Sequence, residues 1–255
     1  MLIPGLVSAT FKSKPVEEVL DIAAAHGLRA VEWSENWHVP EGDVQEASRI
    51  GKLTRRAGLQ VAALGSYYRL GKGMDIVPRI EEAKALGAFV IRIWGGDQPS
   101  CELDEADFMA LAEEAKQISR LCARQGLTVA LEWHKNTVTD TNESGIRFLD
   151  SVGDSHCRTL WQPTMALTVA DRTAGLRAIG PRLVNLHVYH WDGTGRRPLS
   201  EGAEAWRSYF SVVDRTEDHY ALLEFVKDDS VRQFASDAET LLEWLARENL
   251  ASGGE

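Results

Sequence analysis

Cysteine is scarce in this sequence, and the cysteines that are present have no metal-type spacing. Cys101, Cys122 and Cys157 are an odd number in a chain of 255 residues. A scaffold held by disulfide bonds needs paired cysteines, and a structural zinc site needs closely spaced ones. We therefore expect reduced, packed thiols and a cytoplasmic protein.

The sequence also lacks long apolar runs and any excess of positively charged residues. No apolar run approaches the roughly 20 residues of a membrane span. The N-terminal stretch MLIPGLVSATFKSK lacks the basic start and long apolar core of a secretory signal. The formal net charge is −10. Because nucleic acids and many membrane surfaces are anionic, we expect neither as a partner.

Nucleotide-binding loops and linkers are absent as well. The first predicted strand is not followed by Gly-x-Gly-x-x-Gly, and no Walker loop occurs. Both absences disfavour an open doubly wound sheet. No Pro-rich linker, low-complexity tract or shift in composition marks a second domain. We predict one domain over residues 1–250 and a frayed tail at residues 251–255.

What the sequence does contain is a repeated junction. Gly27, Gly58, Gly87 and Gly126 each stand where a helical pattern stops and a Val/Ile/Leu-rich run begins. Glycine reaches the left-handed conformation that ends many helices without a steric penalty. The apolar runs lack polar alternation, which is typical of strands covered on both faces.

Eight strands of this kind are predicted, each followed by a helical segment. They begin near Leu2, Ala30, Leu59, Ala88, Leu127, Cys157, Leu183 and His219. An eightfold strand–helix alternation over about 250 residues is typical of the (β/α)8 barrel. We therefore predict an α/β fold, a single (β/α)8 TIM barrel.

Charged residues interrupt several of these apolar strands. Glu224 lies within HYALLEFVK, Glu132 within LTVALEWH and His187 within LVNLHVYHWD, and Gln162 ends another strand in LWQP. Active sites of such barrels lie at the C-terminal ends of the strands, and residues two apart in a strand face the same way. We expect these four side chains to form one inward-facing ring.

Two carboxylates and an imidazole in a confined site need a positive partner. Oxygen and nitrogen donors suit a divalent cation such as Mn²⁺, Mg²⁺ or Zn²⁺. Taken singly, each residue has another interpretation. Glu132 or Glu224 would pair with a neighbouring arginine, His187 would be a hydrogen-bonded core histidine, and Gln162 would be a polar cap beside Pro163. Their joint position on consecutive strands favours the metal.

The strand-end motifs resemble those of a known family. VEWSENWHVP, GSYYRLG, LEWHKNTVTDT, LWQP and LLEFVKDD look like the sugar phosphate isomerase/epimerase group of the xylose isomerase-like TIM barrels. The resemblance runs over essentially the whole chain. It implies a metal held by Glu132, Gln162, His187 and Glu224.

The sequence departs from the family pattern at one strand end. Gln162 stands where the family usually has Asp, and Met165 where it usually has His. A neutral amide removes one negative charge and should weaken metal binding.

The resemblance also implies proton transfer beside a carbonyl. Glu132 and Glu224 would act as base and acid through an enediolate of a sugar, a sugar phosphate or a related keto-polyol. A keto-polyol dehydratase using the same site and a non-catalytic sugar-binding barrel remain open alternatives. An apurinic-site nuclease is disfavoured, because the chain has only seven histidines and a net charge of −10.

Further polar and aromatic residues follow the predicted strands and are candidates to bind a carbohydrate-like small molecule. They are His38, Tyr67, Trp94, His134, Tyr189, Arg196, Arg197 and Lys227. His134 could instead make a supporting hydrogen bond, and His38 and the arginine pair could be solvated surface. The aromatic side chains could simply pack loops over the barrel. Barrels often form homo-oligomers, and no sequence feature decides whether this one does.

Overall fold

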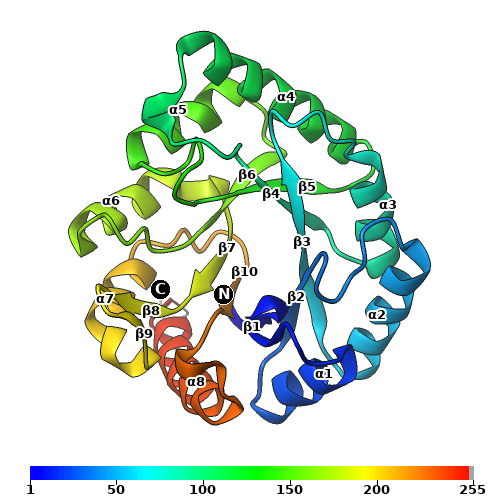
Figure 1. Ribbon diagram of the computed structural model, residues 1–255. Coiled ribbons are helices and arrows are strands. Elements are labelled where there is room, and N and C mark those ends of the chain that lie inside the picture. Colours follow the sequence, from blue (N-terminus) through cyan, green and yellow to red (C-terminus); the bar gives the residue numbers. More distant parts are fainter. Residues whose placement is uncertain (253–255) are drawn as a thin grey trace.

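A computed structural model of the chain shows eight parallel strands closed into a barrel, with helices forming an outer ring (Figure 1). The order around the barrel is β1-β10-β7-β6-β5-β4-β3-β2. The predicted (β/α)8 fold is therefore confirmed. The structure describes residues 1–252, with side chains for residues 1–250, so residues 253–255 of the predicted frayed tail lie outside the described residues.

The barrel strands are short, apart from β3. They are β1 (Leu2–Val7), β2 (Ala30–Ser34), β3 (Gln60–Arg69), β4 (Val90–Trp94), β5 (Thr128–Glu132), β6 (Cys157–Trp161), β7 (Leu183–Val188) and β10 (His219–Leu223). The α-helices are α1 (Val16–Ala25), α2 (Val44–Arg56), α3 (Val77–Leu86), α4 (Glu105–Ala123), α5 (Asn142–Val152), α6 (Val169–Ile179), α7 (Ala203–Phe210) and α8 (Val231–Ser252).

The predicted junction glycines end helices as expected. Gly27, Gly58, Gly87 and Gly126 have positive φ values of 74°, 76°, 85° and 73°. Several helices begin at an acidic or hydroxyl cap, as at Asp104, whose side chain accepts a hydrogen bond from the backbone N–H of Asp107 at 2.8 Å. Such caps satisfy N–H groups that have no partner within the helix.

Alternation along β5 separates the two faces of the barrel wall. Leu131 and Trp133 belong to the main apolar core, whereas Ala130 belongs to a separate small cluster. Trp133 packs so closely on α5 that a Cβ on Gly145 would lie 2.4 Å from its ring. Because neighbouring residues face opposite ways, Glu132 points to the other side, into the barrel mouth.

One short sheet was not predicted. The segment after β7 forms an antiparallel hairpin of β8 (His190–Asp192) and β9 (Gly195–Arg197), which lies near α7 in Figure 1. Its strands have three residues each and no apolar alternation, and the available sequence signal is the two-residue loop of Gly193 and Thr194, which is typical of hairpin turns.

Two further expectations can be compared with the structure. All three cysteines are free; Cys122 and Cys157 are buried, whereas Cys101 is exposed rather than packed. Across the part of the chain that is described, no helix combines the length and apolar character needed to cross a membrane.

Candidate active site

Six buried polar side chains meet at the C-terminal ends of the barrel strands. They form a continuous series of contacts, which we call the polar ring, and its members in order of contact are Gln162, Glu132, Arg92, Glu32, His187 and Glu224. Each is at most 8% exposed. The barrel closure brings them together, because each comes from a different strand or strand end.

One half of the polar ring is centred on His187. Its Nε2 atom lies 3.1 Å from Oε2 of Glu32, and its Nδ1 atom lies 3.4 Å from Oε2 of Glu224. The first contact is a hydrogen bond. The imidazole therefore links a carboxylate on β2 with a carboxylate that follows β10.

The other half is centred on Arg92. Its Nη1 atom lies 3.1 Å from Oε2 of Glu132, and its Nε atom lies 3.6 Å from Oε1 of Glu32. Nη1 also donates a hydrogen bond to the backbone carbonyl of Ser66 at 2.9 Å. Gln162 Nε2 donates to the other oxygen of Glu132 at 3.1 Å. Glu132 is thus held from both sides.

A glycine makes the Glu32–Arg92 contact sterically feasible. A Cβ at Gly65 would lie 2.8 Å from Oε1 of Glu32 and 2.9 Å from Nη2 of Arg92. Contacts this short force neighbouring atoms to move. Gly65 therefore provides the space in which the two charged groups approach each other.

The electrostatics of the polar ring favour its charged forms. Burial alone would lower the pKa of His187, but the carboxylates of Glu224 and Glu32 outweigh burial and raise the pKa to about 10. Burial alone would raise the pKa of Glu32, but His187 and Arg92 outweigh it and lower that pKa. Burial likewise opposes the charge on Arg92, yet Glu132 and Glu32 raise its pKa.

Hydrogen bonding within the polar ring is incomplete. Glu132 Oε2 and His187 Nδ1 are buried and make no hydrogen bond, although each faces an oppositely charged or chargeable partner. Buried polar atoms in native proteins usually have partners. Of the two residues, Glu132 lines the cavity described next, whereas His187 is fully buried, so Glu132 is the candidate to bond a ligand.

The polar ring opens into a cavity of about 600 Å³, the size of a small-molecule site. Arg92, Glu132, Gln162 and Glu224 contribute to its lining. Its remaining walls are mostly aromatic and apolar, and include Tyr67, Trp94, Trp133, Met165, Tyr189, Trp191 and Phe225.

The structure brings half of the predicted substrate-binding residues to this cavity. Tyr67, Trp94, His134 and Tyr189 line it. The Tyr189 hydroxyl donates to the Pro163 carbonyl at 2.9 Å, and burial together with nearby Glu224 and Glu132 raises its pKa well above the usual value. The Tyr189 hydroxyl is therefore a neutral group.

The other half lie outside the lining. His38 is 7% exposed and its Nε2 atom bonds the Lys14 carbonyl at 3.1 Å, so it is not solvated surface. Lys227 lies in the short helix η5 (Lys227–Asp229) and is not among the lining residues, although Glu224 and Phe225 just before it are.

The two predicted arginines are engaged by acidic side chains of their own. Arg196 pairs with Asp229, and Arg197 pairs with Asp192 and Glu201. Neither belongs to the lining of the cavity.

Four charged residues of the site were not among the predicted site residues. Glu32 and Arg92 complete the polar ring, and Arg69 and Lys135 line the outer part of the cavity. Arg69 stacks on Trp94, with its guanidinium carbon 4.3 Å from the ring centroid. Position at a strand end was the available signal for Glu32, Arg69 and Arg92.

The polar ring does not fit the metal that the family resemblance implies. Among the described residues, no group of three or more His, Cys, Asp or Glu side chains could hold a metal ion. Glu132 and His187 each hold an atom without a hydrogen bond, yet Arg92 and Glu224 already face those two atoms. The amide N–H of Gln162 points at Glu132, so this group is oriented as a donor rather than a ligand.

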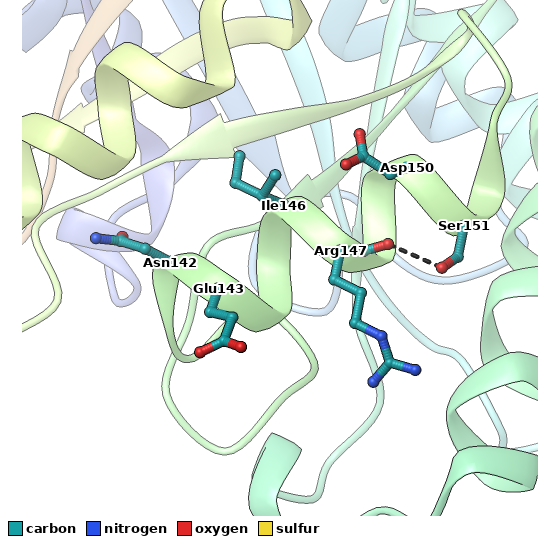
Figure 2. Close-up of a pocket in the computed structure, with 6 residues that line it drawn as sticks. All are labelled: Asn142, Glu143, Ile146, Arg147, Asp150 and Ser151. Atoms are coloured by element: carbon teal, nitrogen blue, oxygen red, sulfur yellow. Dashed lines mark hydrogen bonds between the residues drawn. The ribbon is translucent and has the colours of Figure 1, made fainter.

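A second hollow lies on the outer surface, against α5. Figure 2 shows its lining side chains, Asn142, Glu143, Ile146, Arg147, Asp150 and Ser151, all on that helix. Two of its three charged side chains are paired elsewhere, since Arg147 contacts Glu105 and Asp150 contacts Arg182. No residue of the polar ring lines this hollow, and we assign it no role.

Comparison with known proteins agrees with the fold and the strand-end motifs. Residues 20–248 match the family described as xylose isomerase-like TIM barrel. The chain belongs to this family.

Individual relatives within the family are distant. A 3-dehydroshikimate dehydratase of Bacillus anthracis is 22% identical over 244 residues, which cover 82% of this chain and 84% of that protein. The crystal structure of a probable 3-DHS dehydratase from Bacillus anthracis has a TM-score of 0.79 at 18% identity, covering 95% of this chain and 99% of the other.

Sugar epimerases are similar in structure as well. D-allulose 3-epimerase from Methylomonas sp. has a TM-score of 0.71 at 15% identity, covering 97% of this chain and 98% of the other. D-psicose 3-epimerase from Clostridium cellulolyticum H10 has a TM-score of 0.68 at 14% identity, covering 95% and 98%. At such identities the likeness shows the fold alone.

Proposed function

We propose that this protein is an isomerase or epimerase that moves a proton beside the carbonyl of a sugar or related keto-polyol. The observation that carries the proposal is that two carboxylates, Glu132 and Glu224, and the guanidinium of Arg92 line one cavity. Such a reaction needs a base, an acid and a positive group near the developing oxyanion. The cavity contains a carboxyl group for the base, a second for the acid and a guanidinium for the positive group.

Arg92 would bind the carbonyl oxygen of the substrate. It is 5% exposed and lines the cavity, so a bound ligand can reach it, while Glu132 and Ser66 fix its orientation. A guanidinium held in place beforehand stabilises an enolate oxygen without having to reorganise during the reaction.

Glu224 is the better candidate for the base. Its side chain has one polar partner, His187 Nδ1 at 3.4 Å, and no hydrogen bond joins the two. Glu224 would accept the proton from the carbon beside the carbonyl, and the bonding electrons would move onto the carbonyl oxygen at Arg92. His187, bonded on its far side to Glu32, would hold Glu224 in position.

Glu132, in its protonated form, would deliver a proton to the enolate from the other side. Its two oxygens face Gln162 and Arg92, which fix the carboxyl group at the inner end of the cavity. Return to the same carbon on the opposite face gives an epimer. Return to the neighbouring carbon, with a proton moving between the oxygens, gives the aldose or ketose isomer.

The outer cavity suits a polyol that also carries an anionic group. Trp94, Tyr189 and Trp191 offer flat apolar faces, which pack well against a carbon skeleton. Within the described residues no acidic side chain pairs with Arg69 or Lys135, which both line the cavity. These two cations would attract a carboxylate or phosphate of the substrate.

Dehydration of a keto-polyol is the second candidate. It would use the same enolate. Glu132 would protonate the hydroxyl group on the next carbon, and the enolate would then expel that group as water. The similarity to 3-dehydroshikimate dehydratase over most of both chains favours keeping this candidate. A barrel that only binds sugars is the third candidate.

Product analysis tests the proposal. The purified protein would be incubated with a panel of ketoses, ketose phosphates and keto-polyol acids, and the products identified by NMR and mass spectrometry. We expect an epimer or isomer of one compound, absent with Glu224→Gln. A product lighter by one water would support the dehydratase instead, and no product from any compound would favour the binding-only barrel.

A further inference from the structure

We propose that Arg92 takes the place of a divalent metal ion in this chain and acts as the electrophilic catalyst of the site. The catalytic half of this inference rests on the proposed function, whereas the absence of a metal does not. Three observations support it, and they concern the partners of the carboxylates, the donor set and the position of Arg92.

Every carboxylate of the polar ring already has a nitrogen partner. Glu132 faces Arg92, Glu224 faces His187, and Glu32 faces both. A metal site instead directs several carboxylate and imidazole lone pairs at one empty point. Here the contacts are pairwise: they link neighbouring strands from Gln162 to Arg92, and then Glu32 on β2 connects Arg92 on β4 with His187 on β7.

The donor set is also poor in charge. Gln162 stands at the strand end where the family resemblance calls for an acidic ligand, and its amide N–H donates to Glu132 at 3.1 Å. Using its oxygen for a metal would require the amide to turn and give up that bond. A neutral amide would then replace a carboxylate, which weakens the attraction for a divalent cation.

Arg92 directly contacts one of the carboxylates that a metal would have to bind, Glu132. An ion bound to Glu132 would displace the contact at 3.1 Å from Arg92 Nη1 and lie beside a buried guanidinium that stays protonated. Like charges in a poorly solvated interior repel strongly. Binding a divalent ion would therefore require Arg92 to leave a place fixed by Ser66, Glu32 and Glu132.

The chemistry balances without a metal. Glu224 takes the proton from carbon, the electron pair of the C–H bond forms the enolate double bond, and the carbonyl oxygen gains negative charge at the N–H groups of Arg92. Glu132, which must start in its protonated form, gives its proton to the enolate carbon, and proton exchange with solvent then returns Glu132 and Glu224 to their starting states. No oxidant, reductant or co-reactant is consumed.

Metal analysis of the full-length wild-type protein tests the first half of the inference, that the site holds no divalent metal ion. After dialysis against EDTA and then metal-free buffer, the protein would be titrated calorimetrically with Mn²⁺, beside an untreated sample analysed for bound metals. We expect no stoichiometric metal in the untreated sample and no saturable heat of binding. One ion per chain, lost in His187→Ala, would overturn the inference whether or not any substrate is known.

Two variants of Arg92 test the second half, with the substrate identified by the product analysis above. Arg92→Ala should lose turnover by about 100- to 1,000-fold, as for loss of an oxyanion donor. Added guanidinium ion should restore part of the rate, because the small cation can enter the cavity. EDTA should leave the wild-type rate unchanged.

The contradicting results are equally specific. Full activity of Arg92→Ala, or wild-type activity that EDTA abolishes and Mn²⁺ restores, would overturn the assignment of Arg92. If Arg92 had only a structural role, Arg92→Ala would be inactive and guanidinium would not rescue it. Arg92→Lys, which keeps the charge, would then also be inactive and less stable than the wild type. If no compound turns over, the proposed function fails and the metal measurement still decides the first half.

Discussion

His187 lies between two carboxylates, with Nε2 at 3.1 Å from Glu32 and Nδ1 at 3.4 Å from Glu224. Its ring is fully buried, so neither contact is shared with solvent. The arrangement connects the cavity-lining Glu224 to a carboxylate that substrate cannot reach directly. Under the proposed mechanism, Glu32 would influence Glu224 through the intervening imidazole.

Removing the charge of Glu132 should stop turnover without unfolding the protein. In Glu132→Gln the amide can still contact Gln162 but cannot exchange a proton, so the rate should fall by about 100- to 10,000-fold. Steady-state kinetics and circular dichroism check the two parts. Wild-type activity in this variant would remove Glu132 from the mechanism.

A methyl group at Gly65 should disturb the polar ring. Its Cβ would lie 2.8 Å from Glu32 and 2.9 Å from Arg92, so Gly65→Ala should destabilise the fold by about 1–3 kcal/mol. It should also lower kcat more than it raises KM. Gly193→Ala is the matched control, because no heavy atom lies within 4 Å of the added Cβ. Equal unfolding midpoints for the two variants would show that Gly65 makes no close approach.

Arg69 should contribute to affinity for anionic substrates. Arg69→Gln should raise KM for a carboxylate- or phosphate-bearing substrate by about 10- to 100-fold, the cost of a hydrogen bond to a charged group. A neutral analogue should be affected little. Arg196→Gln provides the comparison, because Arg196 is paired with Asp229 outside the lining. An equal KM change for the charged and neutral compounds would argue against this role.

A buried glutamate outside the site should give stability a distinct pH dependence. Burial raises the pKa of Glu82 to about 7, from an ordinary value of 4.5. The folded state therefore holds an extra proton between these values, and the stability that this proton provides is lost as pH rises through 7. The contribution is on the order of 3 kcal/mol, from the size of the shift.

The measurement is a comparison of unfolding free energies of the wild type and Glu82→Gln from pH 5 to pH 8. The difference should change in favour of the variant as pH rises, because the amide cannot ionise. A difference that stays constant over this range would show that Glu82 keeps an ordinary pKa in the folded state.

The barrel could be predicted because its signals are local. Glycine at the helix ends and apolar runs after each glycine depend only on neighbouring residues, and Gly27, Gly58, Gly87 and Gly126 adopt the expected conformation. The inward direction of Glu132 follows from alternation within one strand. Gln162, His187 and Glu224 could be chosen as candidate site residues on the same grounds.

The contacts within the polar ring depend on register between strands, which the sequence does not contain. The pairing of β2 with β3 shifts between Val31 and Glu32, and that of β3 with β4 shifts between Gly65 and Arg69. These irregularities adjoin Glu32, Gly65 and Arg69. The ion pairs that engage Arg196 and Arg197 likewise depend on a hairpin whose turn residues are visible in the sequence but whose three-residue strands are not.

The most direct test of the central claim is incorporation of solvent deuterium during turnover in heavy water. If Glu224 takes a proton from carbon, recovered product, and in time recovered substrate, should carry deuterium beside the carbonyl, and Glu224→Gln should abolish this label. Product formed with no deuterium at that carbon, or label that persists in Glu224→Gln, would contradict the account.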